Sequence, residues 1–311
     1  MPMRLLGALL VAALLGSAMM TGGEAAARLR VVATIPDLAA LTEAVGGDRV
    51  TVDALARGSQ NPHDLEVRPS LMVKLRRADA LVVNGLDLDQ WADAVIRGAS
   101  NDKVVPGAPG YIDASRGVPI LDVPAGRVDR SMGDVHPFGN PHYTLDPGLA
   151  AVVTQNILEG LARVAPDERS ALERQRREFL ERLDAAMRGW QARLAAVRDA
   201  RIVVYHNNFV YFFRRFGLTQ VGTLEDRPGI PPSPAHLARL IGGLKGGPGT
   251  LLVVVEPWND QRLAARVAEE TGGRLVVLNS RPGAARGVDA YLATVESNVE
   301  ALARAMRRDP S

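Results

Sequence analysis

Three histidines stand in distinctive short sequence settings, and imidazoles gathered in one place are metal ligands. His63 and His142 each follow an Asn-Pro pair, and His206 comes directly after the mainly apolar segment 201–205. The chain has five histidines and no cysteine, so a metal site must use imidazole, carboxylate or water as donors. Zinc or another late divalent metal prefers such a nitrogen-rich cluster.

The residues before two of these histidines restrict the backbone. Proline fixes its own φ and limits the residue before it, so each Asn-Pro pair, at 61–62 and 140–141, positions the next side chain stiffly. Any single histidine can instead be a surface or hydrogen-bonded residue. We interpret His136, in a loop rich in proline and glycine, as a flexible auxiliary donor or an ordinary loop residue, and His236, in an apparent helix, as solvent-facing.

The elements that must position these side chains alternate between strands and helices, which predicts an α/β fold with parallel sheets. In the first half of the chain we expect strands at 29–34, 50–55 and 80–84. Helices are expected at 36–45, after a cap at Ser70, and at 91–96. The segment 104–141 is predicted to be a long loop. A helix then starts at Asp146, an acidic N-cap followed by proline, and runs to about 164.

The second half repeats the pattern. Strands are expected at 201–205, 251–255 and 275–278, and helices at 209–216, 234–241, 261–271 and 288–307. Between the halves, an apolar stripe predicts one long amphipathic helix from 166 to about 198. We therefore expect an N-terminal lobe at 28–165, a rigid linking helix at 166–199 and a C-terminal lobe at 200–311. The alternative is a long helix that belongs wholly to one domain.

The N-terminal segment has the pattern of an export signal. A basic residue, Arg4, precedes an uncharged apolar run, and an Ala-x-Ala sequence ends at Ala27. This predicts a signal peptide at 1–27 that is cleaved after Ala27; an uncleaved anchor is the alternative. With no cysteine to carry a lipid, we expect the mature protein to be free in a bacterial periplasm.

The expected strand ends bring candidate ligands together. In parallel α/β sheets, ligands bind at the carboxyl ends of the strands. His206, Glu256 and Asn279 each follow a predicted strand of the second lobe, and His63 and His142 of the first lobe could face them. Because each imidazole must be neutral to bind, metal capture should weaken below the ordinary histidine pKa of ~6.5.

Overall charge excludes one class of partner. The formal net charge is +2, and no run of lysine and arginine interleaved with aromatic residues is present, so nucleic acid is not expected as a partner. We expect a monomer.

With these motifs the chain resembles the zinc- and manganese-binding solute-binding proteins of metal ABC importers, of the cluster A-I type. The resemblance covers nearly the whole mature chain and rests on segments in the family's order: 61–64 with 68–70, 78–85 leading to Trp91, 140–147, 206–212, 232–234, 256–257 and 291–298. It implies two α/β lobes, a rigid connecting helix, and one metal ion between the lobes. It also implies that His63, His142 and His206 are ligands, and that a membrane permease is the partner.

The sequence departs from this family at the fourth ligand. The family often has an aspartate just after the last strand, where this chain has Asn279 and Ser280. The fourth position is therefore left to water, Glu256, Glu66 or, as a poor donor, Asn279. Three nitrogen donors favour Zn²⁺ over Mn²⁺, although the order of affinities also admits copper or nickel.

Three functions fit such a site. The leading one is capture of Zn²⁺ and its delivery to a permease. A zinc hydrolase with three histidines and a water is the second, but the chain has no His-Glu-x-x-His sequence, so we do not expect an enzyme. The third is a metal-binding adhesin or storage protein.

Overall fold

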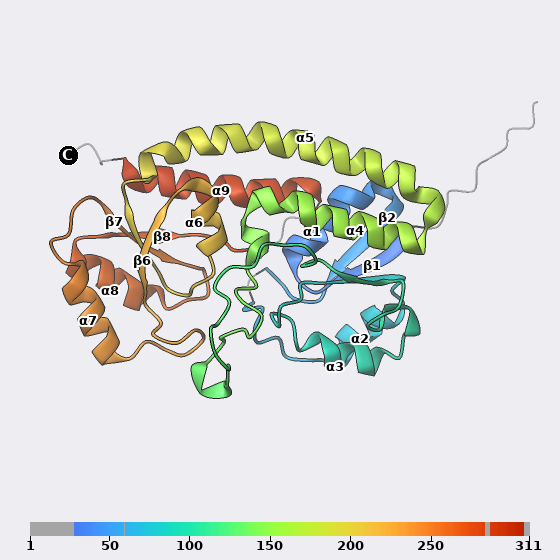
Figure 1. Cartoon of the computed structure of the whole chain (residues 1–311), viewed down its shortest axis with the longest axis horizontal. Coiled ribbons are helices and arrows are strands. Elements are labelled where there is room, and N and C mark those ends of the chain that lie inside the picture. The colour runs from blue at the N-terminus through green and yellow to red at the C-terminus, as the bar shows by residue number, and fades with distance from the viewer. Residues whose placement is uncertain (1–27, 59, 284–286, 308–311) are drawn as a thin grey trace, which may run out of the picture.

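Two parallel four-stranded sheets form the centres of two lobes in the computed structural model, which describes residues 28–58, 60–283 and 287–307 (Figure 1). The first sheet has the order β2-β1-β3-β4, with β1 at Leu29–Ala33, β2 at Val50–Ala54, β3 at Ala80–Val83 and β4 at Tyr111–Asp113. The second has the order β6-β5-β7-β8, with β5 at Arg201–Val204, β6 at Thr219–Thr223, β7 at Leu251–Val255 and β8 at Arg274–Val277. The predicted fold class is confirmed. The predicted signal peptide, 1–27, lies outside the described residues.

Two of these strands, β4 and β6, are not predicted from the sequence. Both lie at an edge of their sheet. β4 has three residues within the segment expected to be a loop, and β6 contains Gly222 and has no fully buried residue. Edge strands need neither an apolar run nor strict alternation, because only one side of each is paired. The central strands are buried on both faces and therefore read as apolar runs.

Helices cover both faces of the two sheets. They are α1 (Pro36–Gly46), α2 (Pro69–Arg76), α3 (Ala92–Ala99), α4 (Ala150–Val164), α5 (Arg169–Leu194), α6 (Val210–Phe216), α7 (Pro234–Leu244), α8 (Gln261–Thr271) and α9 (Val288–Met306). As expected, the carboxylate of Asp146 caps a turn ahead of α4, accepting from the backbone N–H of Gly148. The expected cap at Ser70 is wrong. The chain enters α2 at Arg68, and Pro69 occupies the first turn without a side-chain cap. None of the described helices is long and apolar enough to cross a bilayer.

One large apolar core runs through both lobes. Val31 and Ala33 of the first sheet and Ile202 and Val204 of the second belong to the same cluster of buried side chains. The alternate residue Val203 faces a smaller core under α7 and α8. The long helix α5 spans the two lobes and contacts α1, α4 and α9 (Figure 1). The boundaries 28–165, 166–199 and 200–311 stay a prediction.

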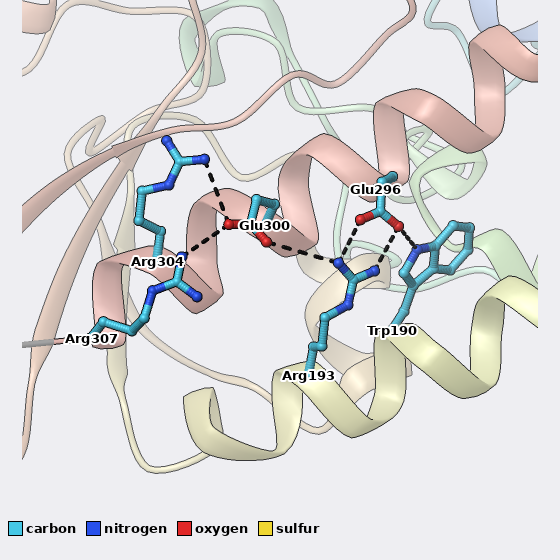
Figure 2. A network of polar contacts seen from close by, with 6 residues as sticks. All are labelled: Trp190, Arg193, Glu296, Glu300, Arg304 and Arg307. Carbon is cyan, nitrogen blue, oxygen red and sulfur yellow. Dashed lines mark hydrogen bonds and ion pairs between the residues drawn. The ribbon is translucent and has the colours of Figure 1, made fainter.

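The side of α5 that faces α9 is held by packing and by polar contacts (Figure 2). Trp190 is 1% exposed. Its indole N–H donates to Glu296 at 2.8 Å, and Arg193 donates to the same carboxylate at 2.5 and 2.6 Å. Arg193 and Glu296 are themselves well exposed, so solvent screens their charges and the pair contributes little.

We expect Trp190→Ala to lower the free energy of unfolding by about 3–5 kcal/mol, because it leaves a large cavity between α5 and α9. Glu296→Gln should cost less than about 1 kcal/mol, because the amide oxygen still accepts from the indole and an exposed ion pair contributes little. Urea unfolding of the two variants measures the difference. Equal losses would mean that the polar network, and not the packing, joins the helices.

Candidate metal centre

His63, His142 and His206 meet at one point between the lobes. One ligand atom from each ring lies within 4.8 Å of those from the other two. Their ring centroids are 5.1, 5.2 and 5.5 Å apart. A tetrahedral ion with bonds of about 2.1 Å separates its nitrogen ligands by roughly 3.4 Å. A small inward movement of the rings would therefore complete a coordination sphere.

The same hydrogen bond from backbone to side chain positions the histidine in both Asn-Pro-His sequences. The side-chain oxygen of Asn61 accepts from the backbone N–H of His63 at 3.2 Å, and that of Asn140 accepts from the backbone N–H of His142 at 3.0 Å. Such a bond from an asparagine to the backbone two residues later closes a tight turn. The stiff presentation expected from proline thus also depends on the asparagine before it.

The carbonyl groups of the two prolines are held by a single segment, the one that follows β3. The Trp91 indole N–H donates to the carbonyl of Pro62 at 2.8 Å, and the Asn84 amide donates to the carbonyl of Pro141 at 3.1 Å. Asn84 is fully buried. Two ligands from distant parts of the chain are therefore positioned by one support.

His206 comes from the second lobe, two residues after β5, and is oriented by a carboxylate. Its Nδ1 lies 2.7 Å from Glu225, and both side chains are about nine-tenths buried. The same Glu225 oxygen accepts from the backbone N–H of Gly229 at 2.8 Å. A carboxylate on one ring nitrogen leaves the other nitrogen free for a metal and raises its basicity. Sequence reasoning missed Glu225, which follows the unpredicted strand β6.

The surroundings shift the three histidines in opposite directions. Burial, and then the charges of neighbouring histidines, lower the pKa of His63 and of His142 well below the usual range. Burial also acts to lower the pKa of His206, but the hydrogen bond and charge of Glu225 outweigh it and the pKa is raised. Two of the three rings are thus held neutral, which is the state that binds metal.

Two of the ligand nitrogen atoms are free to bind a metal ion. The Nε2 atoms of His63 and His142 are buried and have no hydrogen-bond partner among the described residues. A buried polar atom without a partner costs about 1–3 kcal/mol. Nitrogen atoms left free on converging rings fit a transition-metal ion, which would satisfy them together.

His136 lies closer to the centre than we expected for a loop residue. Its ring is 5.1 Å from that of His63, and its buried Nε2 also has no partner in the part of the chain that the structure describes. It stands between two hollows of about 180 and 370 Å³. Carboxylates line both: Asp122 and Asp134 in the smaller, and Asp87, Asp129 and Asp134 in the larger. This negative potential would attract cations toward the rings.

The other predicted donors are placed less favourably. Glu66 is exposed and paired with Arg68 at 2.5 Å, and it is not among the ligand atoms that converge. Asn279 is half-buried, and its backbone groups are bonded to the Asn298 side chain. Glu256 is 4% exposed and its charge acts on His206, but it is not among the ligand atoms that converge within 4.8 Å.

The interpretation of His236 as solvent-facing is also wrong. Its side chain is half-buried, and Nε2 lies 2.9 Å from the carbonyl oxygen of Thr223. It lies at the start of α7, where the Ser233 hydroxyl caps the helix by accepting from its backbone N–H. It takes no part in the cluster of three rings.

A family comparison agrees with this geometry. The model of the family ZnuA, described as "Zinc-uptake complex component A periplasmic", matches residues 31–305. The chain belongs to this family. Its members are metal-binding components of ABC transporters that act outside the cytoplasmic membrane. A zinc-uptake component is a binding and transport protein, so membership of this family confirms the prediction that the chain is not an enzyme.

Individual relatives differ in the metal for which they are named. The zinc-binding lipoprotein AdcA of Streptococcus pneumoniae serotype 4 is 25% identical over 289 residues, covering 90% of this chain and 56% of AdcA. The iron-binding protein YfeA of Yersinia pestis is 23% identical, covering 90% and 87%. The solved structure of the SBP FpvC from Pseudomonas aeruginosa in complex with Mn²⁺ is 27% identical, with a TM-score of 0.74, covering 90% and 98%. The chain thus spans about half the length of AdcA.

Proposed function

We propose that this protein captures one divalent transition-metal ion, Zn²⁺ by preference, and delivers it to the membrane permease of an ABC importer. The observation that carries the proposal is the convergence of His63, His142 and His206 from three separate segments. We further propose that it works in the periplasm after removal of residues 1–27.

The donor set supports zinc. Three imidazole nitrogens suit Zn²⁺, whereas Mn²⁺ prefers more oxygen donors. Mn²⁺ is the second candidate, because FpvC, with Mn²⁺ in its solved structure, is similar over nearly all of its length. A water molecule or the nearby carboxylate of Glu256 would complete the coordination.

Metal analysis of the protein purified from a periplasm, followed by competition between zinc and manganese, tests the proposal. We expect one ion per chain and a preference for Zn²⁺ of at least about a hundredfold, in line with the general order of affinities. A protein that binds neither metal, or that binds several ions with equal weakness, would contradict it.

His136→Ala should weaken zinc binding by about tenfold or less, a loss well below that of removing any one of the three converging ligands. The reason is that His136 faces His63 but does not share the point where the three rings meet. Titration with a fluorescent zinc chelator as competitor measures the loss. A loss as large as that of His63→Ala would make His136 a full ligand.

A further inference from the structure

Arg281 is a buried cation that joins two segments far apart in the chain. It lies in the segment that follows β8 of the second sheet and is 5% exposed. Its Nη1 donates to the backbone carbonyl of Gln60 at 2.8 Å, and its Nη2 donates to the hydroxyl of Ser280 at 3.1 Å. The guanidinium carbon lies 4.8 Å from the centroid of the Trp258 ring. Because Gln60 follows β2 of the first sheet, its hydrogen bond with Arg281 crosses from the second lobe to the first.

A second contact holds the same two segments together. Gly58 lies against Pro282 and Gly283: a Cβ at position 58 would be 2.3 Å from the carbonyl oxygen of Pro282 and 2.8 Å from the Cα of Gly283. Both of these atoms belong to the backbone, so they cannot rotate away as the end of a side chain could. Glycine allows the two backbones to approach this closely. The lobes are therefore in direct backbone contact at Gly58, beside the hydrogen bond from Arg281.

The turn that makes these contacts leads directly to His63. Two hydrogen bonds close it: the backbone N–H of Gln60 donates to the carbonyl of Arg57 at 3.1 Å, and the backbone N–H of Arg57 donates to the side-chain oxygen of Gln60 at 2.9 Å. The tight turn of Asn61 follows at once and ends at His63. Since one turn continues into the next, a displacement of the carbonyl that Arg281 holds would be passed on to His63.

His63 is thus held from both lobes. From the first lobe, the Trp91 indole donates to the carbonyl of Pro62. From the second lobe, which also supplies His206, Arg281 holds the preceding turn. The rings of His63 and His206 have centroids 5.2 Å apart, and an ion with bonds of about 2.1 Å needs this separation to be kept small. A bond from the lobe of one ligand to the segment of the other acts on that separation.

We propose that Arg281 is a positioning residue of the metal centre: it keeps the segment of His63 attached to the lobe that carries His206, and thereby slows release of the ion. Gly58 belongs to the same contact, because it lets the two backbones meet. Without this attachment the segment of His63 would keep its hold on the first lobe alone, and the two rings would separate more readily. The inference rests on the proposed function, since it concerns the affinity of the same site.

A double-mutant cycle with Zn²⁺ tests the inference. Arg281→Met removes the donor at similar volume and should weaken zinc binding by about ten- to a hundredfold, the usual effect of changing a residue that orients a metal ligand. Combined with His63→Ala, it should add less than about threefold, because the ligand through which it acts is gone. Combined with His142→Ala, it should keep its full effect. Competition against a chelator measures affinity, and stopped-flow transfer of the ion to the chelator should show faster release.

Gly58→Ala is a second test that leaves Arg281 in place. The added methyl group must push the backbones at Gly58 and Pro282 apart, so zinc binding should weaken by about tenfold, again with little further loss in the His63→Ala background. Gly189→Ala is the matched control. A Cβ at Gly189 would meet nothing within 4 Å, so this variant should bind zinc as the wild type does.

Equal losses from Arg281→Met in the His63→Ala and His142→Ala backgrounds would overturn the inference, because Arg281 would then act on the fold as a whole and not through His63. Wild-type affinity in a folded Arg281→Met protein would overturn it as well. Should Arg281→Met fail to fold, the same cycle with Gly58→Ala decides. A wild-type protein that binds no zinc would instead refute the proposed function, and this inference with it.

Discussion

Replacing His142 with alanine is expected to weaken zinc binding by about a hundred- to a thousandfold. Four ligands together contribute roughly 10–16 kcal/mol to a protein zinc site, so one ligand accounts for about a quarter of this. His142 is 7% exposed, and its unpartnered Nε2 is buried with those of its neighbours. Competition against a chelator of known affinity measures the change. His63→Ala and His206→Ala should give losses of the same order.

His236→Ala is the matched control for these variants. It removes an imidazole from the same lobe as His206, together with one hydrogen bond to the Thr223 carbonyl. We expect a loss of about 1 kcal/mol in unfolding free energy and no change in zinc affinity. If all four alanine variants weaken binding equally, the three-histidine centre is refuted.

Changing Glu225 to glutamine should weaken zinc binding by about ten- to a hundredfold near neutral pH, because the carboxylate orients His206 and raises its basicity. The amide can still accept from Gly229, so the local backbone bond is kept. An isothermal titration at pH 8 measures this effect apart from proton competition. An affinity equal to that of the wild type would show that Glu225 does not support the ligand.

The pH dependence gives a second, independent readout of the same pair. Because the pKa of His206 is raised, protons begin to compete with the metal at a pH above the ordinary histidine pKa. Metal capture should therefore weaken as the pH falls through the raised pKa. His63 and His142, with lowered pKa values, compete only in stronger acid. In Glu225→Gln the decline should move to lower pH, because burial then lowers the pKa of His206.

The pH dependence of stability in the metal-free protein has the opposite sign. A raised pKa stabilises the folded chain fully below the unfolded value of ~6.5, and this contribution is lost as the pH rises through the folded pKa of His206. Thermal unfolding of metal-free protein should therefore show the Glu225 contribution in mild acid. In mild acid the lowered pKa values of His63 and His142 destabilise the folded chain and so oppose this contribution. The difference in stability between the wild type and Glu225→Gln isolates the part that comes from His206 and Glu225.

The main features of the centre could be predicted because they depend on local sequence. Central strands buried on both faces, such as β7, are continuous apolar runs, and the residue after each such strand is easy to find. The Asn-Pro pairs before His63 and His142 mark restricted turns. Together these signals predicted the fold class and the three histidines that the structure brings together.

The supporting residues could not be predicted, because their roles depend on distant contacts. Glu225 follows β6, an edge strand without an apolar run, so nothing in the sequence marked the end of a strand there. Nothing in the sequence marks Arg281, and only the folded chain shows that it is buried. His136 lies in a segment without periodicity, and its place depends on contacts that are distant in sequence: its ring faces His63, and the backbone N–H of Asp134 donates to the carbonyl of Pro228.

The bond from the Trp91 indole to the carbonyl of Pro62 has a practical consequence. An indole whose N–H is tied to the residue before His63 shares any movement of that histidine. A second indole, that of Trp258, lies under the buried guanidinium of Arg281. Loading with an ion should therefore change the ultraviolet emission of the protein, which would allow capture and release to be followed in real time without a label.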